Sequence, residues 1–130
     1  MTPKELKYTK DHMWVSLSEK EGTATAGITD YAQSQLGDIV FFDLPEVGTR
    51  LGQFEKMGEV ESTKAVSDLL SPVGGEVIEV NQAVLDSPEL ANNDPYGAGW
   101  LVKLKLDNVS EVENLMTGEQ YEKFIEQESA

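Results

Sequence analysis

Lys64 is the side chain whose surroundings most suggest chemistry, because it is the single positive charge in the run E-S-T-K-A-V-S-D at residues 61–68. Segments with strand-like alternation flank it, so we predict a hairpin over about residues 59–71 with Lys64 near its tip. The small neighbours Thr63 and Ala65 leave its amine accessible. A lysine amine that loses its proton in an enzyme's active site can accept an acyl group, and the resulting amide has no charge. A merely solvated lysine fits the same spacing.

His12 is the only histidine, and the sequence has no cysteine. This combination cannot supply a zinc site of ordinary composition. Ser16 and Ser18 are close to His12, but the G-x-S-x-G context that accompanies a serine nucleophile is missing. We therefore interpret His12 as structural or solvent-facing. The chain has 24 carboxylates, so closeness in sequence does not identify an acid–base pair. We expect no metal site and no catalysis by the polypeptide itself.

The composition is that of a small acidic protein, for which we expect one domain over residues 1–130. Hydrophobic residues make up 39% and charged residues 26%, which is ordinary for a soluble globular protein. The 24 acidic against 10 basic residues give a formal charge of -14. Such a surface should bind neither nucleic acid nor anionic membranes. It should favour basic patches on protein partners, although solubility alone would also explain the charge.

The sequence also bears on location. Its apolar runs are too short to span a bilayer, and the N-terminus has no signal peptide. We therefore expect a cytoplasmic protein, or a mitochondrial one if a transit peptide has been removed. The absence of cysteine excludes disulfides and any thiol nucleophile supplied by the chain.

Short strands are expected to position the Lys64 hairpin. Alternating apolar residues predict strands at residues 13–18, 23–28, 38–44 and 100–106. After Lys64 the alternation is broken by Ser71-Pro72 and Gly74-Gly75 and resumes at Val77, which predicts a second hairpin.

Helices are predicted mainly late in the chain. Thr29 is suited to the N-cap of a helix that Gly37 ends, and residues 83–85 suggest a helical turn. Two pairs have capping-box spacing before C-terminal helices, Ser110 with Glu113 and Thr117 with Gln120. Strands followed by late helices predict a β-rich α+β fold.

Several blocks of the sequence together resemble one known family. The segment E-S-T-K-A-V-S-D-L-L-S-P-V-G-G-E-V-I-E-V-N at residues 61–81 closely resembles the lipoyl-lysine segment of the glycine cleavage system H protein family. Three further blocks look like that family in order and spacing: H-M-W-V, G-I-T-D-Y-A-Q-S-Q-L-G-D-I-V-F-F-D-L-P-E-V-G and S-P-E-L-A-N-N-D-P-Y-G-A-G-W-L-V-K. The resemblance extends from about Leu6 to the C-terminal helix, and its independent blocks make it specific.

The resemblance implies a lipoyl/biotinyl-type flattened barrel, or barrel-sandwich hybrid, of two sheets with peripheral helices and a C-terminal helix. It implies lipoic acid in amide linkage to Lys64, placed there by a lipoate-attaching enzyme. The arm would then carry the aminomethyl group of glycine from a pyridoxal-phosphate-dependent glycine decarboxylase to an aminomethyltransferase that uses tetrahydrofolate. A flavin-dependent dihydrolipoamide dehydrogenase would reoxidise it. On this interpretation the chain is a carrier and not a catalyst.

The resemblance also indicates residues that could contact the loaded arm. The cargo carries a cationic amine, so a nearby carboxylate could hold it and slow hydrolysis. Asp68 matches an acidic position of the family motif and is the first candidate. The usual family motif H-E-W reads H-M-W here, so Met13 stands beside His12 where a glutamate would stand. Asp11 or Asp68 could compensate for that missing carboxylate.

Two alternatives remain at this point. One is a lipoyl domain that serves a 2-oxo acid dehydrogenase, but such domains are generally shorter and read D-K-A, where this chain has Thr63-Lys64-Ala65. A biotin carrier is weaker still, because the M-K-M context is missing. The other alternative is an interaction or lipoate-relay protein that no longer takes part in glycine cleavage, and Met13 is the feature that favours it.

Overall fold

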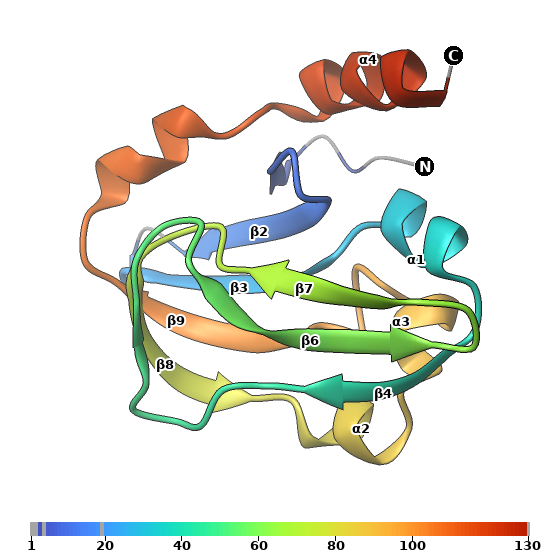
Figure 1. The fold of residues 1–130 in the computed structure, drawn as a ribbon. Coiled ribbons are helices and arrows are strands. Elements are labelled where there is room, and N and C mark those ends of the chain that lie inside the picture. The colour runs from blue at the N-terminus through green and yellow to red at the C-terminus, as the bar shows by residue number, and fades with distance from the viewer. Residues whose placement is uncertain (1–2, 4, 19, 130) are drawn as a thin grey trace.

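Two antiparallel β-sheets that face each other form the body of the protein (Figure 1). The computed structural model describes residues 3, 5–18 and 20–129. Within them, one sheet has the strand order β1-β2-β3-β9-β8-β5 and the other the order β4-β6-β7. The strands are β1 (Lys7–Tyr8), β2 (Met13–Ser18), β3 (Thr23–Ile28), β4 (Ile39–Asp43), β5 (Arg50–Leu51), β6 (Lys56–Ser62), β7 (Val66–Leu70), β8 (Gly75–Val80) and β9 (Val102–Leu106).

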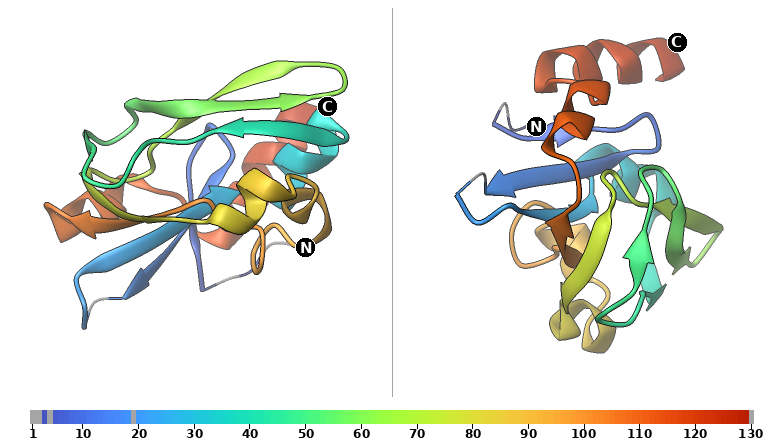
Figure 2. Two further views of the ribbon diagram at one scale, coloured as in Figure 1. Left: turned by 90° about the horizontal axis from the view of Figure 1, so that it is seen from below. Right: turned by 90° about the vertical axis from the view of Figure 1, so that its left-hand side faces the viewer.

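Helices surround these two layers, which Figure 2 shows one above the other. They are α1 (Asp30–Leu36), α2 (Gln82–Asp86), α3 (Leu90–Asn93), the 3-10 helix η1 (Val109–Asn114) and α4 (Gly118–Ser129). In the part of the chain that the structure describes, no helix is both long enough and apolar enough to cross a membrane. The predicted β-rich α+β class is confirmed.

The four strands predicted from alternation are all present as β2, β3, β4 and β9, with ends that differ by at most two residues. Alternation identifies them because each buries one face in the core. The strands β1 and β5 were not predicted. Each has two residues, which is too short for any alternation to be recognised.

The main core lies between the sheets and consists of the inward-facing side chains of both. Those less than 3% exposed include Val15, Ala26, Phe42, Val60, Leu69, Val77 and Leu104. Burying each of the larger aliphatic or aromatic side chains stabilises the fold by about 1.5–3 kcal/mol. This core fixes the registers of β6 and β7, and therefore the position of the hairpin between them.

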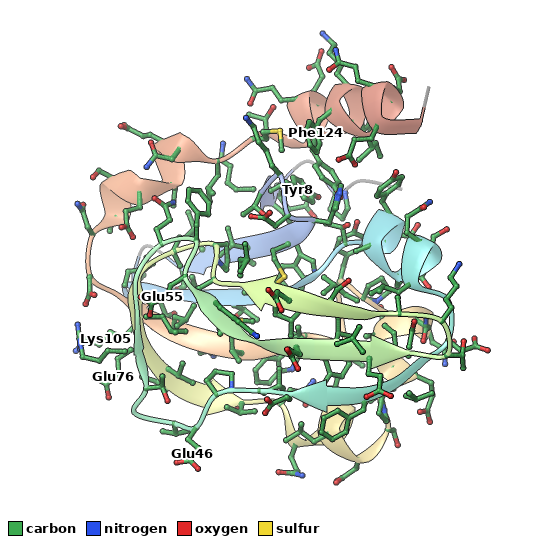
Figure 3. The ribbon with its side chains drawn as sticks, viewed as in Figure 1. Tyr8, Glu46, Glu55, Glu76, Lys105 and Phe124 are labelled. Carbon is green, nitrogen blue, oxygen red and sulfur yellow. The ribbon has the colours of Figure 1, made fainter. Side chains whose placement is uncertain are left out.

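A second apolar cluster attaches α4 to the outer face of the six-stranded sheet. Trp14 points to this face, and a Cβ on its neighbour Gly27 would lie 2.7 Å from the indole Nε1, so only glycine leaves room for the ring. Tyr8 stacks on Tyr121 of α4 with ring centroids 4.7 Å apart and an interplanar angle of 7°. Figure 3 shows Phe124 of the same helix above Tyr8. Aromatic packing therefore determines where α4 lies.

The second predicted hairpin is wrong. β7 belongs to the three-stranded sheet, whereas β8 pairs with β9 and β5 in the other sheet. The chain crosses between the sheets at Ser71, which is fully buried and donates from its hydroxyl to the Val73 carbonyl at 2.6 Å. Alternation shows that Leu69 and Val77 face a core, but it does not show which strand each one pairs with.

The helix ends confirm some of the predicted caps. Thr29 Oγ1 accepts from Ala32 N at 3.1 Å and starts α1. Thr117 and Gln120 exchange the two hydrogen bonds of a capping box.

Two other expectations about helices failed. The box predicted for Ser110 and Glu113 is wrong, because Asn108 caps η1 by accepting from Ser110 N at 3.1 Å. Asn108 precedes the helix, where an Asx side chain can reach the first free amides. Helix α3 lies in an Asn- and Pro-rich segment for which no helix was predicted.

Candidate functional site

The turn between β6 and β7 carries Lys64 on an exposed tip. Ser62, at the end of β6, is 6% exposed and fixes the turn from within. Its amide donates to the Ala65 carbonyl at 2.8 Å, and its Oγ accepts from Ala65 N at 3.1 Å and from Lys64 N at 3.3 Å. Thr63 N donates to the Asp38 carbonyl at 3.0 Å, which ties the tip to the segment before β4. The backbone beneath Lys64 is therefore held on both sides.

The aliphatic stem of Lys64 passes close to the end of α1. A Cβ placed on Gly37 would lie 3.3 Å from Lys64 Cε. Gly37 ends α1 with φ 80° and ψ -153°, a region that is essentially restricted to glycine. Gly37 therefore serves two purposes, since it ends the helix and leaves space for the lysine stem.

A cavity of about 380 Å³ lies beside the hairpin. Its walls come from the β1–β2 turn and the start of β2, from α1, from β7 and from the C-terminal end of α4. Met13, Leu36 and Leu69 give it apolar surface, while Asp11, Asp68 and Glu128 add carboxylates. Pockets that bind small molecules share this mixture of an apolar lining and a few polar groups. An alkyl arm that ends in a cation fits such a lining.

All four residues named as possible arm contacts line this cavity: Asp11, His12, Met13 and Asp68. Met13 is 1% exposed and contributes apolar surface without any charge. Asp68 is exposed and already has a cation beside it, because Lys56 Nζ lies 3.3 Å from its Oδ1 and 3.0 Å from Glu59 Oε2. These hydrogen bonds, first that of Glu59, raise the pKa of Lys56, which stays charged at neutral pH.

Tyr31 of α1 and Glu128 of α4 are among the residues of the cavity wall that were not identified from the sequence. Tyr31 lies within the block that resembles the family, but nothing in its spacing indicated a pocket. Glu128 is one of several carboxylates on an exposed helix, so its position in the sequence gives no signal of its own. Only the docking of α4 brings it to the cavity.

His12 occupies a strained position at the edge of the same cavity. It is the last residue of the loop between β1 and β2 and has φ 66°, in the left-handed region that residues other than glycine uncommonly adopt. Its Nδ1 lies 2.8 Å from Tyr121 Oη, and its Nε2 lies 3.0 Å from Glu128 Oε2. The ring also packs on Tyr31 at 5.0 Å and on Phe124 at 5.9 Å. His12 therefore links the start of β2 to α4.

Tyr121 is the buried centre of this link. Its hydroxyl lies 2.7 Å from Thr29 Oγ1, and its side chain is 1% exposed. Burial raises the pKa of Tyr121, so its hydroxyl stays protonated at neutral pH. Among the described residues, no group of three or more His, Asp or Glu side chains is arranged to hold a metal ion.

The outer face of the three-stranded sheet is apolar next to the Lys64 tip and acidic around it. Phe41, Glu61 and Val66 are paired across β4, β6 and β7. Phe41 and Val66 are 55% and 60% exposed, and Val40 beside them is 50% exposed because of an irregularity in β4. A partner that reaches Lys64 from this side would meet both features.

Comparison with known proteins agrees with this geometry. The family model described as "Glycine cleavage H-protein" matches residues 6–128. Glycine cleavage system H proteins of Carboxydothermus hydrogenoformans and Geobacillus kaustophilus are 48% and 52% identical, over 98% and 95% of this chain and 97% and 96% of theirs.

A crystal structure of a glycine cleavage system H protein from Mycobacterium marinum superposes with a TM-score of 0.84 at 41% identity, covering 98% of this chain and 99% of that one. The predicted lipoyl-type barrel-sandwich fold, in which two curled sheets do not close into a barrel, is thereby confirmed. These relatives favour a lipoyl carrier in the glycine cleavage system over the two alternatives drawn from the sequence. The chain belongs to the glycine cleavage H-protein family.

Proposed function

We propose that lipoic acid is attached through an amide to Nζ of Lys64 and that the chain carries the aminomethyl group of glycine on this arm. The observation that carries the proposal is the position of Lys64, which is exposed on a fixed hairpin turn, has its stem beside Gly37, and is followed by Ala65 in the wall of a cavity. An exposed amine is open to an attaching enzyme. A fixed backbone gives the arm a defined origin.

The cofactor supplies the sulfur chemistry, and the chain supplies its attachment, orientation and shelter. The sequence has no cysteine, so no thiol of the chain competes with the arm for disulfide exchange. The polypeptide itself catalyses no step in this proposal, and it serves as the carrier component of the system.

The proposed partners are the other components of the system. They are the pyridoxal-phosphate-dependent glycine decarboxylase, the aminomethyltransferase that uses tetrahydrofolate, the flavin-dependent dihydrolipoamide dehydrogenase and a lipoate-attaching enzyme. The formal charge of -14 favours basic rims on these proteins. The exposed apolar residues beside Lys64, which are Val40, Phe41 and Val66, would form the apolar core of an interface with such a partner. The bacterial relatives support a cytoplasmic location.

The cavity beside the hairpin is the proposed resting place of the loaded arm. Met13 and Leu69 would cover its alkyl part, and Asp11 and Asp68 would provide negative charge near its amine. His12 would act at the edge of the cavity through its contacts with α4.

Two measurements test the proposed function. The intact mass of the protein, after expression with a lipoate ligase, should rise by one lipoyl group in the wild type and in the control Lys105→Arg. Lys64→Arg should remain unmodified at unchanged thermal stability, because the side chain is exposed. The lipoylated wild type should then support exchange of carbon between glycine and bicarbonate with the glycine decarboxylase. Modification that survives in Lys64→Arg, or the absence of exchange, would contradict the proposal.

A further inference from the structure

We propose that Glu128 of α4 is the carboxylate that binds the amine of the loaded arm, in place of the charge that Met13 lacks. This inference rests on the proposed function, since it concerns the arm on Lys64. It makes the C-terminal helix part of the cargo site.

Glu128 is held at the cavity by a hydrogen-bond chain that works in either charge state of His12. With neutral His12, the Thr29 hydroxyl donates to Tyr121, Tyr121 donates to Nδ1, and the proton on Nε2 is donated to Glu128. With charged His12, Nδ1 donates to Tyr121 and the Tyr121 hydroxyl donates to Thr29. In both cases Nε2 donates to Glu128. The carboxylate therefore keeps its place, and its remaining lone pairs can accept from a cation.

The backbone of His12 gives a second reason to regard this contact as functional. A histidine at φ 66° costs conformational energy that glycine would avoid in the same loop. The strain is held by the contacts of the ring with Tyr121, Glu128 and Tyr31. Residues held in such conformations are concentrated at functional sites.

The other carboxylates of the cavity are less suited to the amine. Asp68 shares Lys56 with Glu59, so a second cation must compete with an ion pair that is already formed. Asp11 is an exposed residue of the loop, as Glu128 is of α4, but within the described residues no side-chain hydrogen bond orients its carboxylate. Glu128 is instead oriented by an imidazole that, when neutral, leaves the full negative charge of the carboxylate in place.

A carboxylate at this point would slow loss of the cargo by keeping its amine protonated. Loss begins when the lone pair of the neutral amine forms a C=N bond and the C–S bond breaks, with sulfur taking the electron pair. Water then converts the released iminium ion into formaldehyde and ammonium. A protonated amine has no lone pair for the first step. An ion pair with Glu128 favours the protonated form.

The matched pair Glu128→Gln and Glu126→Gln tests the inference. Both remove one charge from α4, but Glu126 lies outside the residues that line the cavity. With arms loaded by the glycine decarboxylase and no aminomethyltransferase present, we expect ammonia release about tenfold faster from Glu128→Gln, because a charge-assisted hydrogen bond is lost. Glu126→Gln should match the wild type. Equal rates for the two variants would overturn the inference, while failure to load the wild type would overturn the proposed function as well.

A second readout needs no cofactor. The chain has one histidine, so the imidazole nitrogen signals of His12 are unambiguous in NMR spectra. Titration of the unmodified protein with methylammonium should shift the Nε2 signal in the wild type and in Glu126→Gln, beyond the effect of sodium chloride at equal ionic strength. The same shift in Glu128→Gln, or none in any of the three, would contradict binding at Glu128. This result is independent of whether Lys64 is lipoylated.

The double variant Met13→Glu with Glu128→Gln provides a rescue. Met13 lines the same cavity, so a carboxylate there should return ammonia release to within about threefold of the wild-type rate. The melting temperature and the Lys64 lipoylation of each variant serve as controls for folding. If the release rate of the double variant stays at that of Glu128→Gln while the variant remains folded, a carboxylate in this cavity is not what protects the cargo.

Discussion

The Lys64 hairpin and the cavity beside it are both parts of the proposed carrier site, but they are built in opposite ways. The hairpin is formed by residues 56–70, and its turn depends mainly on Ser62. The cavity combines the β1–β2 turn, α1, β7 and α4, which are far apart in the sequence and meet only through packing. Attachment of the cofactor should therefore tolerate distant changes, whereas shelter of the cargo should depend on how α4 docks.

The largest expected effect separates these two regions by loosening α4. Tyr121→Ala removes a buried, stacked ring and one of the two hydrogen-bond partners of the Thr29 hydroxyl, which should lower the free energy of unfolding by about 3 kcal/mol. Lipoylation of Lys64 should proceed at the wild-type rate, because no contact of the hairpin is lost. Chemical denaturation and intact mass measure the two effects. A large loss of lipoylation at a temperature where the variant is folded would show that the regions are coupled.

Alkaline pH should act on the same aromatic cluster. Burial raises the pKa of both Tyr8 and Tyr121, so the folded state holds their protons when the unfolded state begins to lose them. Their contribution to stability is complete below pH ~10 and then falls by about 1.4 kcal/mol per pH unit for each tyrosine.

Denaturant midpoints measured between pH 9 and 12 would show this dependence. In Tyr8→Phe the slope of stability against pH should be smaller by the contribution of one tyrosine. Tyr31 lines the cavity and lies outside the aromatic cluster that contains Tyr8 and Tyr121. An identical slope in the wild type and Tyr8→Phe would mean that Tyr8 titrates normally.

The smallest expected effect concerns the hairpin alone. Ser62→Ala removes the oxygen that accepts from the amides of Lys64 and Ala65, at a cost of about 1 kcal/mol. The initial rate of lipoylation should fall, because the lysine is presented from a looser turn. Ammonia release from the loaded arm should stay near the wild-type rate. If ammonia release became faster while the rate of lipoylation stayed unchanged, the roles proposed for the hairpin and the cavity would be contradicted.

The same contrast explains what could be predicted from the sequence. The strands and the hairpin were predictable because alternation of apolar residues is a local signal, and the caps at Thr29 and Thr117 were predictable because capping uses neighbouring residues. The strand with which β8 pairs could not be predicted, since the pairing depends on which sheet the chain enters after Ser71. Glu128 was missed because its place at the cavity depends on contacts of α4 with residues distant in the sequence, such as His12.

The closeness of the Lys64 stem to Gly37 has a kinetic consequence for a carrier. An arm tethered beside its own cavity samples it at an effective concentration in the millimolar range, as a short linker provides. Affinity of the cavity for the arm need then be no stronger than millimolar for the arm to spend about half of its time sheltered. Weak binding also means rapid release, so a partner enzyme can capture the arm during its frequent excursions. Under the proposed function, the tether would thus reconcile protection of the cargo with its delivery.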